Sequence, residues 1–334
     1  MKKFKRLVSI MMLAAAVVFA AGCTKPDEPN NGGDNNGGGD NGGGNGGGVT
    51  PEVPTIPAGA VDGLFTINEH GGHVYFSQGN LQYQASTNTF RFAENQWDMV
   101  GGSYMLSNTQ EGNVAGSDNC LVSNIYSGWV DLFGYGTSGW QSGCVRFEPY
   151  AISNSPDGFL NKDLNGEYAK ADWGVFNPIS NGGNQAGQWR VPTKDEWEYI
   201  INGRNGTRYA RAQVNGVNGI ILVPDDWDAS IYEFKSPNSG GSNWDVNTIY
   251  QSIWENTLEP AGCVFLPNAG WRSINSIGIH VTELGSYGNY WTATAWQPAT
   301  TNCAYKLSVG WQGPGVGNGF VNSGYAVRLV QDAE

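Results

Sequence analysis

Alternation of apolar and polar residues, the pattern of a half-buried β-strand, recurs along the chain from about residue 60 onwards. Gly71-Gly72 stands between the first two alternating segments and predicts a hairpin turn there. Val, Tyr, Phe and Ile dominate these segments, which agrees with strand propensity. The predicted strands are residues 64–68, 73–83, 89–92, 209–214, 219–223, 262–266, 290–294, 303–309 and 325–330.

Helical periodicity is confined to two short segments. Thr193 followed three residues later by Glu196 is the capping-box signature of a helix start, and apolar residues follow from Trp197 at the spacing i, i+3, i+4. We therefore expect a helix after Thr193 that ends near Gly203, and a second helix over residues 247–256. No repeat of roughly 20–50 residues is present, which argues against a solenoid or propeller.

The N-terminal residues carry a targeting pattern and no globular pattern. Basic residues at positions 2, 3, 5 and 6 precede an apolar stretch over residues 7–21, and Ala-Gly leads into Cys23. This arrangement resembles the lipobox of bacterial lipoproteins. It predicts a signal peptide over residues 1–22 and lipidation of Cys23, which becomes the mature N-terminus. An ordinary secretory signal with an incidental cysteine is the alternative.

A flexible linker is expected between Cys23 and residue 59. Residues 30–48 contain only Gly, Asn and Asp, which cannot bury a core. Asp27 and Glu28 resemble the surface-export signal of outer-membrane lipoproteins, so we expect an outer-membrane lipoprotein exposed on the cell surface, with the periplasmic face as the alternative. Residues 60–334 then form a single domain that contacts the membrane only through the N-terminal lipid.

Composition and charge narrow the classes of protein. Only 14% of the residues are charged and 12% are aromatic, and 49 are Gly. This composition excludes coiled coils, helical bundles and polytopic membrane proteins, which need long apolar or Ala/Glu/Lys/Leu-rich runs. The formal net charge is -12, and removal of the basic signal makes it more negative. We therefore expect no nucleic-acid partner.

Four cysteines remain if Cys23 is lipidated. An even number in an exported chain suggests disulfides, with three connectivities open. We favour Cys120–Cys144 and Cys263–Cys303; four buried thiols are the alternative. No C-x-x-C is present, which argues against a zinc ribbon or a thioredoxin-like site.

Four segments together resemble a known family. Residues 189–199 read W-R-V-P-T-K-D-E-W-E-Y, and residues 264–272 read V-F-L-P-N-A-G-W-R. Residues 288–294 read G-N-Y-W-T-A-T, and residues 324–330 read G-Y-A-V-R-L-V. In order and spacing these resemble the Fibrobacter succinogenes major paralogous (FISUMP) domain, in the formylglycine-generating-enzyme-like branch of the C-type-lectin fold. The resemblance covers about residues 62–330.

The resemblance implies a fold and leaves the function open. The implied fold is α+β and similar to C-type lectins and sulfatase-modifying factors, with a twisted antiparallel sheet, about two helices and long Gly/Asn-rich loops. The resembled formylglycine-generating enzymes use a cysteine pair near the C-terminus. Here Cys303 stands alone, with Cys263 forty residues away. The hydrolase motif G-x-S-x-G and the zinc-protease motif H-E-x-x-H are also absent. We therefore expect a protein without enzymatic activity, with an enzyme of unknown type as the minor alternative.

Metal ligation is a second possibility that the residue types raise. His70, His73 and His280 could ligate a metal, although turn-flanking histidines are more often simple polar turn residues. Several Asp residues could bind Ca²⁺ with backbone carbonyls, but turn and cap roles are favoured. We therefore expect no cofactor and leave a structural calcium open. The candidate calcium ligands are Asp131, Asp172, Asp225 and Asp226.

Ligand recognition by aromatic residues is the remaining reading. Calcium-dependent lectins of this fold use E-P-N or Q-P-D together with W-N-D. Here the tripeptides at 259–261 and 297–299 end in Ala, and W-N-D is absent. Aromatic anchors with small polar neighbours in the C-terminal loops instead suit a sugar ring or a protein. The predicted ligand-binding residues are Trp271, Tyr287, Trp296, Asn302, Trp311, Asn318, Phe320 and Asn322.

The sequence thus predicts a surface-anchored, non-catalytic binding lipoprotein that recognises a glycan or a host or bacterial protein through its C-terminal aromatic loops. A hypervariable receptor is a special case of this prediction, because relatives with the implied fold vary these loops. The alternative is a structural or assembly component of the cell envelope, such as an adhesin tip or accessory subunit.

Overall fold

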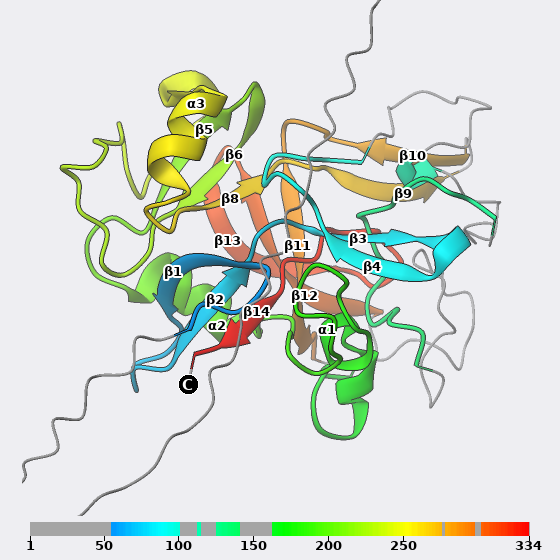
Figure 1. The fold of residues 1–334 in the computed structure, drawn as a ribbon. Coiled ribbons are helices and arrows are strands. Elements are labelled where there is room, and N and C mark those ends of the chain that lie inside the picture. The colour runs from blue at the N-terminus through cyan, green and yellow to red at the C-terminus, as the bar shows by residue number, and fades with distance from the viewer. Residues whose placement is uncertain are drawn as a thin grey trace, which may run out of the picture. The chain divides into compact units, whose positions relative to one another are not determined.

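Small, mostly antiparallel β-sheets with few helices make up the part of the chain that the computed structural model describes (Figure 1). The described residues are 55–100, 112–114, 125–140, 162–275, 278–297 and 302–333. They belong to one unit, Pro54–Glu334. The predicted signal peptide, Cys23, the linker up to residue 54, Cys120 and Cys144 lie outside the described residues. The fold class is therefore mixed α+β, as expected.

In the described part of the chain, three sheets and two hairpins carry the strands, and neighbouring strands within them are antiparallel except β5 with β7. One sheet has the order β1 (Ala60–Thr66), β2 (His73–Ser77), β14 (Val330–Asp332). The second has the order β7 (Thr248–Ile249), β5 (Tyr209–Val214), β6 (Val217–Leu222), β8 (Val264–Pro267). The third has the order β11 (Gly288–Ala295), β12 (Cys303–Gly310), β13 (Gly313–Phe320). The hairpins are β3 (Leu81–Gln84) with β4 (Thr89–Phe92) and β9 (Trp271–Asn275) with β10 (Gly278–Thr282).

The helices are short, and none in the described part of the chain has the length and hydropathy needed to cross a membrane. The α-helices are α1 (Trp173–Phe176), α2 (Lys194–Glu198) and α3 (Gln251–Ile253). α2 and α3 continue as π-helical turns, η4 (Tyr199–Gly203) and η6 (Trp254–Leu258). The 3-10 turns are η1 (Ala85–Thr87), η2 (Gly112–Val114), η3 (Gly166–Ala171) and η5 (Trp244–Val246).

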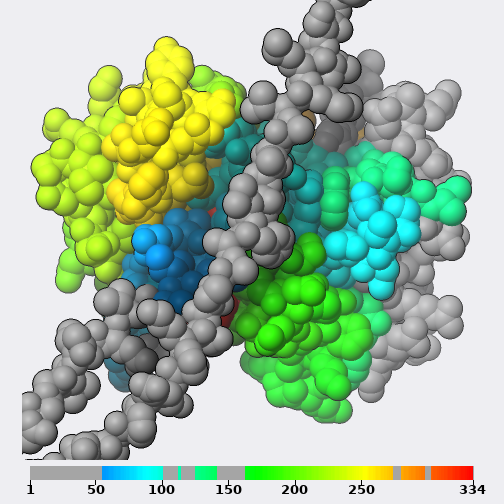
Figure 2. All heavy atoms as spheres, viewed as in Figure 1, coloured from blue at the N-terminus to red at the C-terminus, as the bar shows by residue number. Residues whose placement is uncertain are grey.

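Three groups of buried apolar residues form the core. One includes Trp173, Trp189 and Trp291. A second joins the buried face of α2, at Trp197, to the sheets β1–β2–β14 and β11–β12–β13. The third packs η6 on β5, β6 and β8, and Figure 1 shows the α3 region beside these strands. In the same view Figure 2 shows the α3 region (yellow) and the region of η3 and α1 (green) at the surface.

Local signals in the sequence are confirmed where hydrogen bonds are local. β1 and β2 form the predicted hairpin, with Gly71 at φ 80°. The Asn68 side chain closes this turn by accepting hydrogen bonds from the amides of His70 and Gly72. The helix start at Thr193 carries both halves of the capping box.

Three predicted elements are wrong by more than a shift of their ends. The predicted strand 73–83 breaks into β2 and β3, because the chain passes the Ala93 backbone so closely at Gly79 that a Cβ there would lie 2.5 Å from the Ala93 carbonyl oxygen. The second helix begins at Gln251, since the residues before it pair with β5 as β7. Of the predicted strand 325–330, only Val330 lies in a regular strand, while residues before it form isolated bridges. Strands β9, β10 and β13 were not predicted.

The predicted Cys263–Cys303 disulfide is wrong. Cys263 is a free, buried thiol, and it packs beside Trp254 and Phe265 in the core under α3. Cys303 lies instead at the start of β12, in a different sheet. The prediction failed because both residues belong to apolar strand patterns, and such patterns do not show which sheet each strand joins.

Candidate ligand-binding surface

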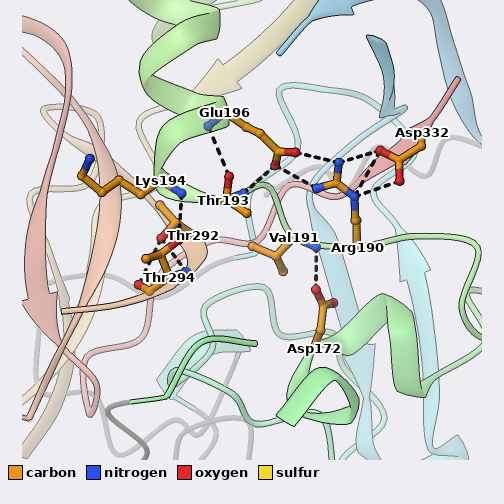
Figure 3. Close-up of polar contacts among 9 residues, drawn as sticks. All are labelled: Asp172, Arg190, Val191, Thr193, Lys194, Glu196, Thr292, Thr294 and Asp332. Atoms are coloured by element: carbon orange, nitrogen blue, oxygen red, sulfur yellow. Dashed lines mark hydrogen bonds and ion pairs between the residues drawn. The ribbon is translucent and has the colours of Figure 1, made fainter. Parts of the chain in front are cut away.

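The segment W-R-V-P-T connects the C-terminal strand to helix α2 through Arg190 (Figure 3). The two terminal nitrogens of Arg190 each donate to one carboxylate oxygen of Glu196, both at 2.8 Å. The same guanidinium binds Asp332 of β14, with Nη2 2.5 Å from Oδ1. Glu196 also accepts from the Thr193 amide at 2.7 Å. A planar, five-donor side chain suits such a double pairing, and it fixes the start of α2 against β14.

Asp172 holds the other side of this segment. Its Oδ1 accepts from the Gly174 amide at 3.0 Å. Its Oδ2 accepts from the Val191 amide at 2.7 Å (Figure 3). Burial raises the pKa of Asp172 to about 7. This candidate calcium ligand is therefore the N-cap of α1 and an anchor for the segment that leads into α2.

The same segment positions the end of strand β11. The Pro192 carbonyl accepts from the Ala293 amide at 2.8 Å. The Lys194 amide donates to Thr294 Oγ1 at 3.0 Å (Figure 3). α2 lies against β11, β12 and β13. The first turn of α2 therefore stands next to the end of the sheet that carries the predicted C-terminal ligand-binding residues.

Four residues at that end form what we call the aromatic surface: Trp296, Tyr305, Asn318 and Phe320. The rings of Trp296 and Tyr305 pack at a centroid distance of 4.9 Å. In the register of β12 and β13, Tyr305 lies opposite Asn318, and Cys303 lies opposite Phe320. Directly opposite residues point to the same face of a sheet, as do alternate residues of one strand. The side chains of Tyr305, Asn318 and Phe320 therefore share one face. Phe320 is 66% exposed, and Asn318 is exposed as well.

The charge beside the aromatic surface is already paired. Lys194 Nζ lies 5.3 Å from the centroid of the Tyr305 ring. It is also 3.0 Å from carboxylate oxygens of Asp195 and Glu198. The surface therefore presents ring faces and neutral amides, which suits a ligand without formal charge.

The structure brings together only part of the predicted ligand-binding set. Trp296, Asn318 and Phe320 lie in the aromatic surface, and Asn302 is exposed one residue before β12. Tyr305, which the sequence analysis missed, belongs with them; its position opposite Asn318 depends on strand register, which no local pattern shows.

The other predicted residues lie elsewhere. Trp311 is 53% exposed in the β12–β13 turn, and its carbonyl accepts from the Gly241 amide at 2.5 Å. Trp271 and Tyr287 form an edge-to-face pair at 6.5 Å, and Asn322 is half-buried after β13.

The closing motif places Arg328 in the interior. Its Nη2 donates to Gln96 Oε1 at 2.5 Å, and Gln96 donates to Glu259 Oε1 at 2.9 Å. Its Nη1 is 3.5 Å from Asn80 Oδ1. Burial lowers the pKa of Arg328 to about 10, which leaves the guanidinium charged at neutral pH. Arg328 thus connects segments from three parts of the chain.

The candidate metal ligands are not gathered into a site. No group of three or more His, Cys, Asp or Glu that could hold a metal ion is found among the described residues. His70 and His73 flank the first hairpin, and His280 lies on β10. Asp225 instead accepts from the Thr66 amide at 2.6 Å and from Arg204 at 3.1 Å.

Asp131 and Asp226 complete the predicted calcium ligands. Asp131 is buried, and it accepts from the Asn113 amide group at 2.7 Å and from the Val100 amide at 2.9 Å. Burial raises the pKa of Asp131 to about 6. Asp226 is exposed in the turn after β6. Asp131 therefore holds the segments of Val100 and Asn113 by hydrogen bonds, much as Asp172 holds the segment of Val191.

In comparisons with known proteins, no family model, no curated protein and no solved structure matches this chain.

Proposed function

We propose that the protein is a non-catalytic binding lipoprotein, anchored on the outer membrane through Cys23, whose aromatic surface binds a glycan. The proposal includes a C-type-lectin-like, FISUMP-type fold for residues 60–334. The observation that carries it is the exposed Phe320 ring beside the packed pair of Trp296 and Tyr305. Large aromatic side chains left in water cost free energy, and a bound apolar face recovers it.

The chemistry of the aromatic surface favours a sugar ring. The CH face of a hexose stacks on aromatic rings, and its hydroxyls need neutral hydrogen-bond partners. Asn318 on β13 and Asn302 before β12 offer amide donors and acceptors at the border of the rings. The nearby ammonium of Lys194 is occupied by two carboxylates. These features together support a neutral glycan more than a charged one.

A binding assay on immobilised neutral glycans tests the proposal. We expect Trp296→Ala combined with Phe320→Ala to lower affinity by at least about tenfold, since each ring contributes on the order of 1 kcal/mol or more. The matched control is Tyr250→Ala, because Tyr250 is 70% exposed but stands before α3, outside the aromatic surface.

Two further outcomes have defined meanings. Binding that survives EDTA agrees with aromatic stacking, whereas binding lost in EDTA would point to a calcium-dependent site. If the double variant binds glycans as the parent does, or if no glycan binds, the glycan proposal fails. A stoichiometric protein captured by the parent and not by the double variant would then favour the assembly component.

A further inference from the structure

The opposite face of the same sheet carries a polar cluster that the sequence analysis did not single out. Successive residues of a strand point to opposite faces, so Lys306 and Ser308 face away from Tyr305. Lys306 Nζ donates to Asn289 Oδ1 at 2.5 Å and also to the Ser308 hydroxyl oxygen. Ser308 Oγ in turn donates to Asn289 Oδ1 at 3.0 Å. We call these three residues the Lys306 cluster.

The Lys306 cluster holds a cation among neutral groups. The two hydrogen-bond acceptors of the ammonium are uncharged, and Nζ lies 5.3 Å from the centroid of the Tyr325 ring. Within the described residues no carboxylate forms an ion pair with Lys306. Burial alone lowers the pKa of Lys306 to about 8. A half-buried ammonium with no counter-ion among the described residues is costly, and a bound anion would offset that cost.

Bare backbone lies next to the cluster on the same face. Gly315 is opposite Ser308 and Gly317 is opposite Lys306. A Cβ atom added at Gly315 or Gly317 would meet no heavy atom of the described residues within 4 Å, so the space next to both residues is open. Glycine in a strand often marks the place where a ligand approaches the backbone closely.

Aromatic rings border this open stretch at both ends. At Gly319, the next residue of β13 after Gly317 on the same face, an added Cβ would lie 2.6 Å from the Tyr325 ring. At Gly310, the next residue of β12 after Ser308 on the same face, an added Cβ would clash with the Tyr287 ring. The open stretch is therefore short, flat and closed at two ends, with the ammonium on one side.

We propose that the Lys306 cluster and the backbone at Gly315 and Gly317 form a second binding site, which takes the carboxylate-bearing ring of an acidic sugar. The carboxylate pairs with Lys306 and a ring hydroxyl bonds Ser308, while the buried Asn289 orients both side chains. The flat glycine backbone admits the ring where any side chain would exclude it. This site is independent of the aromatic surface, since the two lie on opposite faces of the sheet.

NMR of the full chain with glucuronate as the probe tests this site. We expect the amide signals of Gly315 and Gly317 to shift saturably with glucuronate and to stay in place with glucose. Lys306→Met should weaken glucuronate binding by at least about tenfold, as expected for loss of a charge-assisted contact. Lys235→Met is the matched control, because Lys235 is an exposed lysine between β6 and η5.

A glycine variant tests the site without touching its charge. Gly317→Val adds a side chain where the structure has open space, and a β-branched residue suits a strand, so the fold should persist. The same side chain should fill the open stretch and abolish glucuronate binding. Glucuronate binding that survives Lys306→Met or Gly317→Val overturns the proposal.

Two comparisons distinguish acidic-sugar binding at this site from simple anion binding and from glycan binding at the aromatic surface. If acetate shifts the same signals with the same affinity, the site recognises an anion and not a sugar ring, and the proposal fails in that form. Trp296→Ala with Phe320→Ala should leave the glucuronate shifts unchanged. Failure of the aromatic surface to bind neutral glycans would therefore leave this proposal standing. Failure of the Lys306 cluster to bind glucuronate would likewise leave the proposed glycan binding standing.

Discussion

A single buried carboxylate, Asp172, shows how burial and hydrogen bonding oppose each other in this protein. Two backbone amides favour the ionised form, yet burial dominates and raises the pKa from the ordinary value of 3.8 to about 7. The folded state therefore binds more protons than the unfolded state between these two values. The stabilisation from this group is fully present below pH 3.8 and is lost as the pH rises through 7.

Asp172→Asn tests this balance. The variant presents an NH₂ group to one of the two backbone amides, so we expect a loss of about 1–3 kcal/mol in the free energy of unfolding at pH 7. It should also flatten the fall in stability between pH 4 and pH 7, since Asn does not titrate. Urea unfolding of both proteins at several pH values measures the two effects. An unchanged slope would contradict the assigned pKa.

Lys306 titrates in the opposite sense. Its pKa falls from 10.5 to about 8, so the folded state releases its proton earlier than the unfolded state does. The cost of the buried charge is present below pH 8 and disappears as the pH rises towards 10.5. A side-chain NMR titration should give a midpoint near pH 8 for Lys306. A midpoint at the ordinary lysine value of 10.5 would remove the electrostatic support for the second site.

At the scale of elements, the start of α2 shows how local bonds support a tertiary contact. The Thr193 hydroxyl accepts from the Glu196 amide at 3.2 Å, while Glu196 also holds Arg190. α2 has one α-helical turn before it becomes π-helical, so its start depends strongly on this cap. The first turn also supports Lys194 beside Tyr305.

Thr193→Ala should therefore lower the free energy of unfolding by about 1 kcal/mol, the usual cost of removing a cap. Thr193→Ser keeps the hydroxyl and should stay close to the parent. Chemical denaturation of the two variants side by side measures the difference. Equal losses in both would show that the methyl group matters, and not the hydrogen bond.

Strand β13 shows why some elements escaped sequence reasoning. Residues 313–320 read G-P-G-V-G-N-G-F, which resembles a loop because Gly and Pro disfavour strands. In the structure this strand pairs with β12 along its whole length as the outer strand of its sheet. Pro314 is tolerated there, because an outer strand needs fewer amide donors. The pairing with β12 overrides the local preference.

At the scale of the whole molecule, buried polar links join segments that are distant in sequence. Arg328 reaches Gln96, and Gln96 reaches Glu259. Gln96 Oε1 also accepts from the Phe265 amide at 2.8 Å, which extends the link to β8. Such a network specifies the packing only while every member is present.

Arg328→Met should break this network and leave Gln96 and Asn80 without their charged partner. We expect a loss of roughly 2–3 kcal/mol in the free energy of unfolding, because bonds to a charged donor are among the stronger ones. Lys235→Met is a suitable control, since Lys235 is exposed between β6 and η5. Thermal unfolding compares the two, and a similar small effect in both would argue against the network.

Features that depend on neighbours in sequence could be read from the sequence alone. These include the hairpin at Gly71-Gly72 and the helix start at Thr193, because their hydrogen bonds join residues only a few positions apart. The aromatic character of the C-terminal strands was also readable, as was the lipoprotein pattern that stays a prediction.

Only the tertiary structure decided which of those residues meet. Strand register places Tyr305 beside Asn318, separates Trp271 and Tyr287 from the aromatic surface, and puts Lys306 over bare glycine backbone. Burial, which follows from packing of the whole chain, sets the pKa of Asp172 and leaves Cys263 a free thiol. These outcomes depend on contacts between residues far apart in sequence, whose pairing no local pattern encodes.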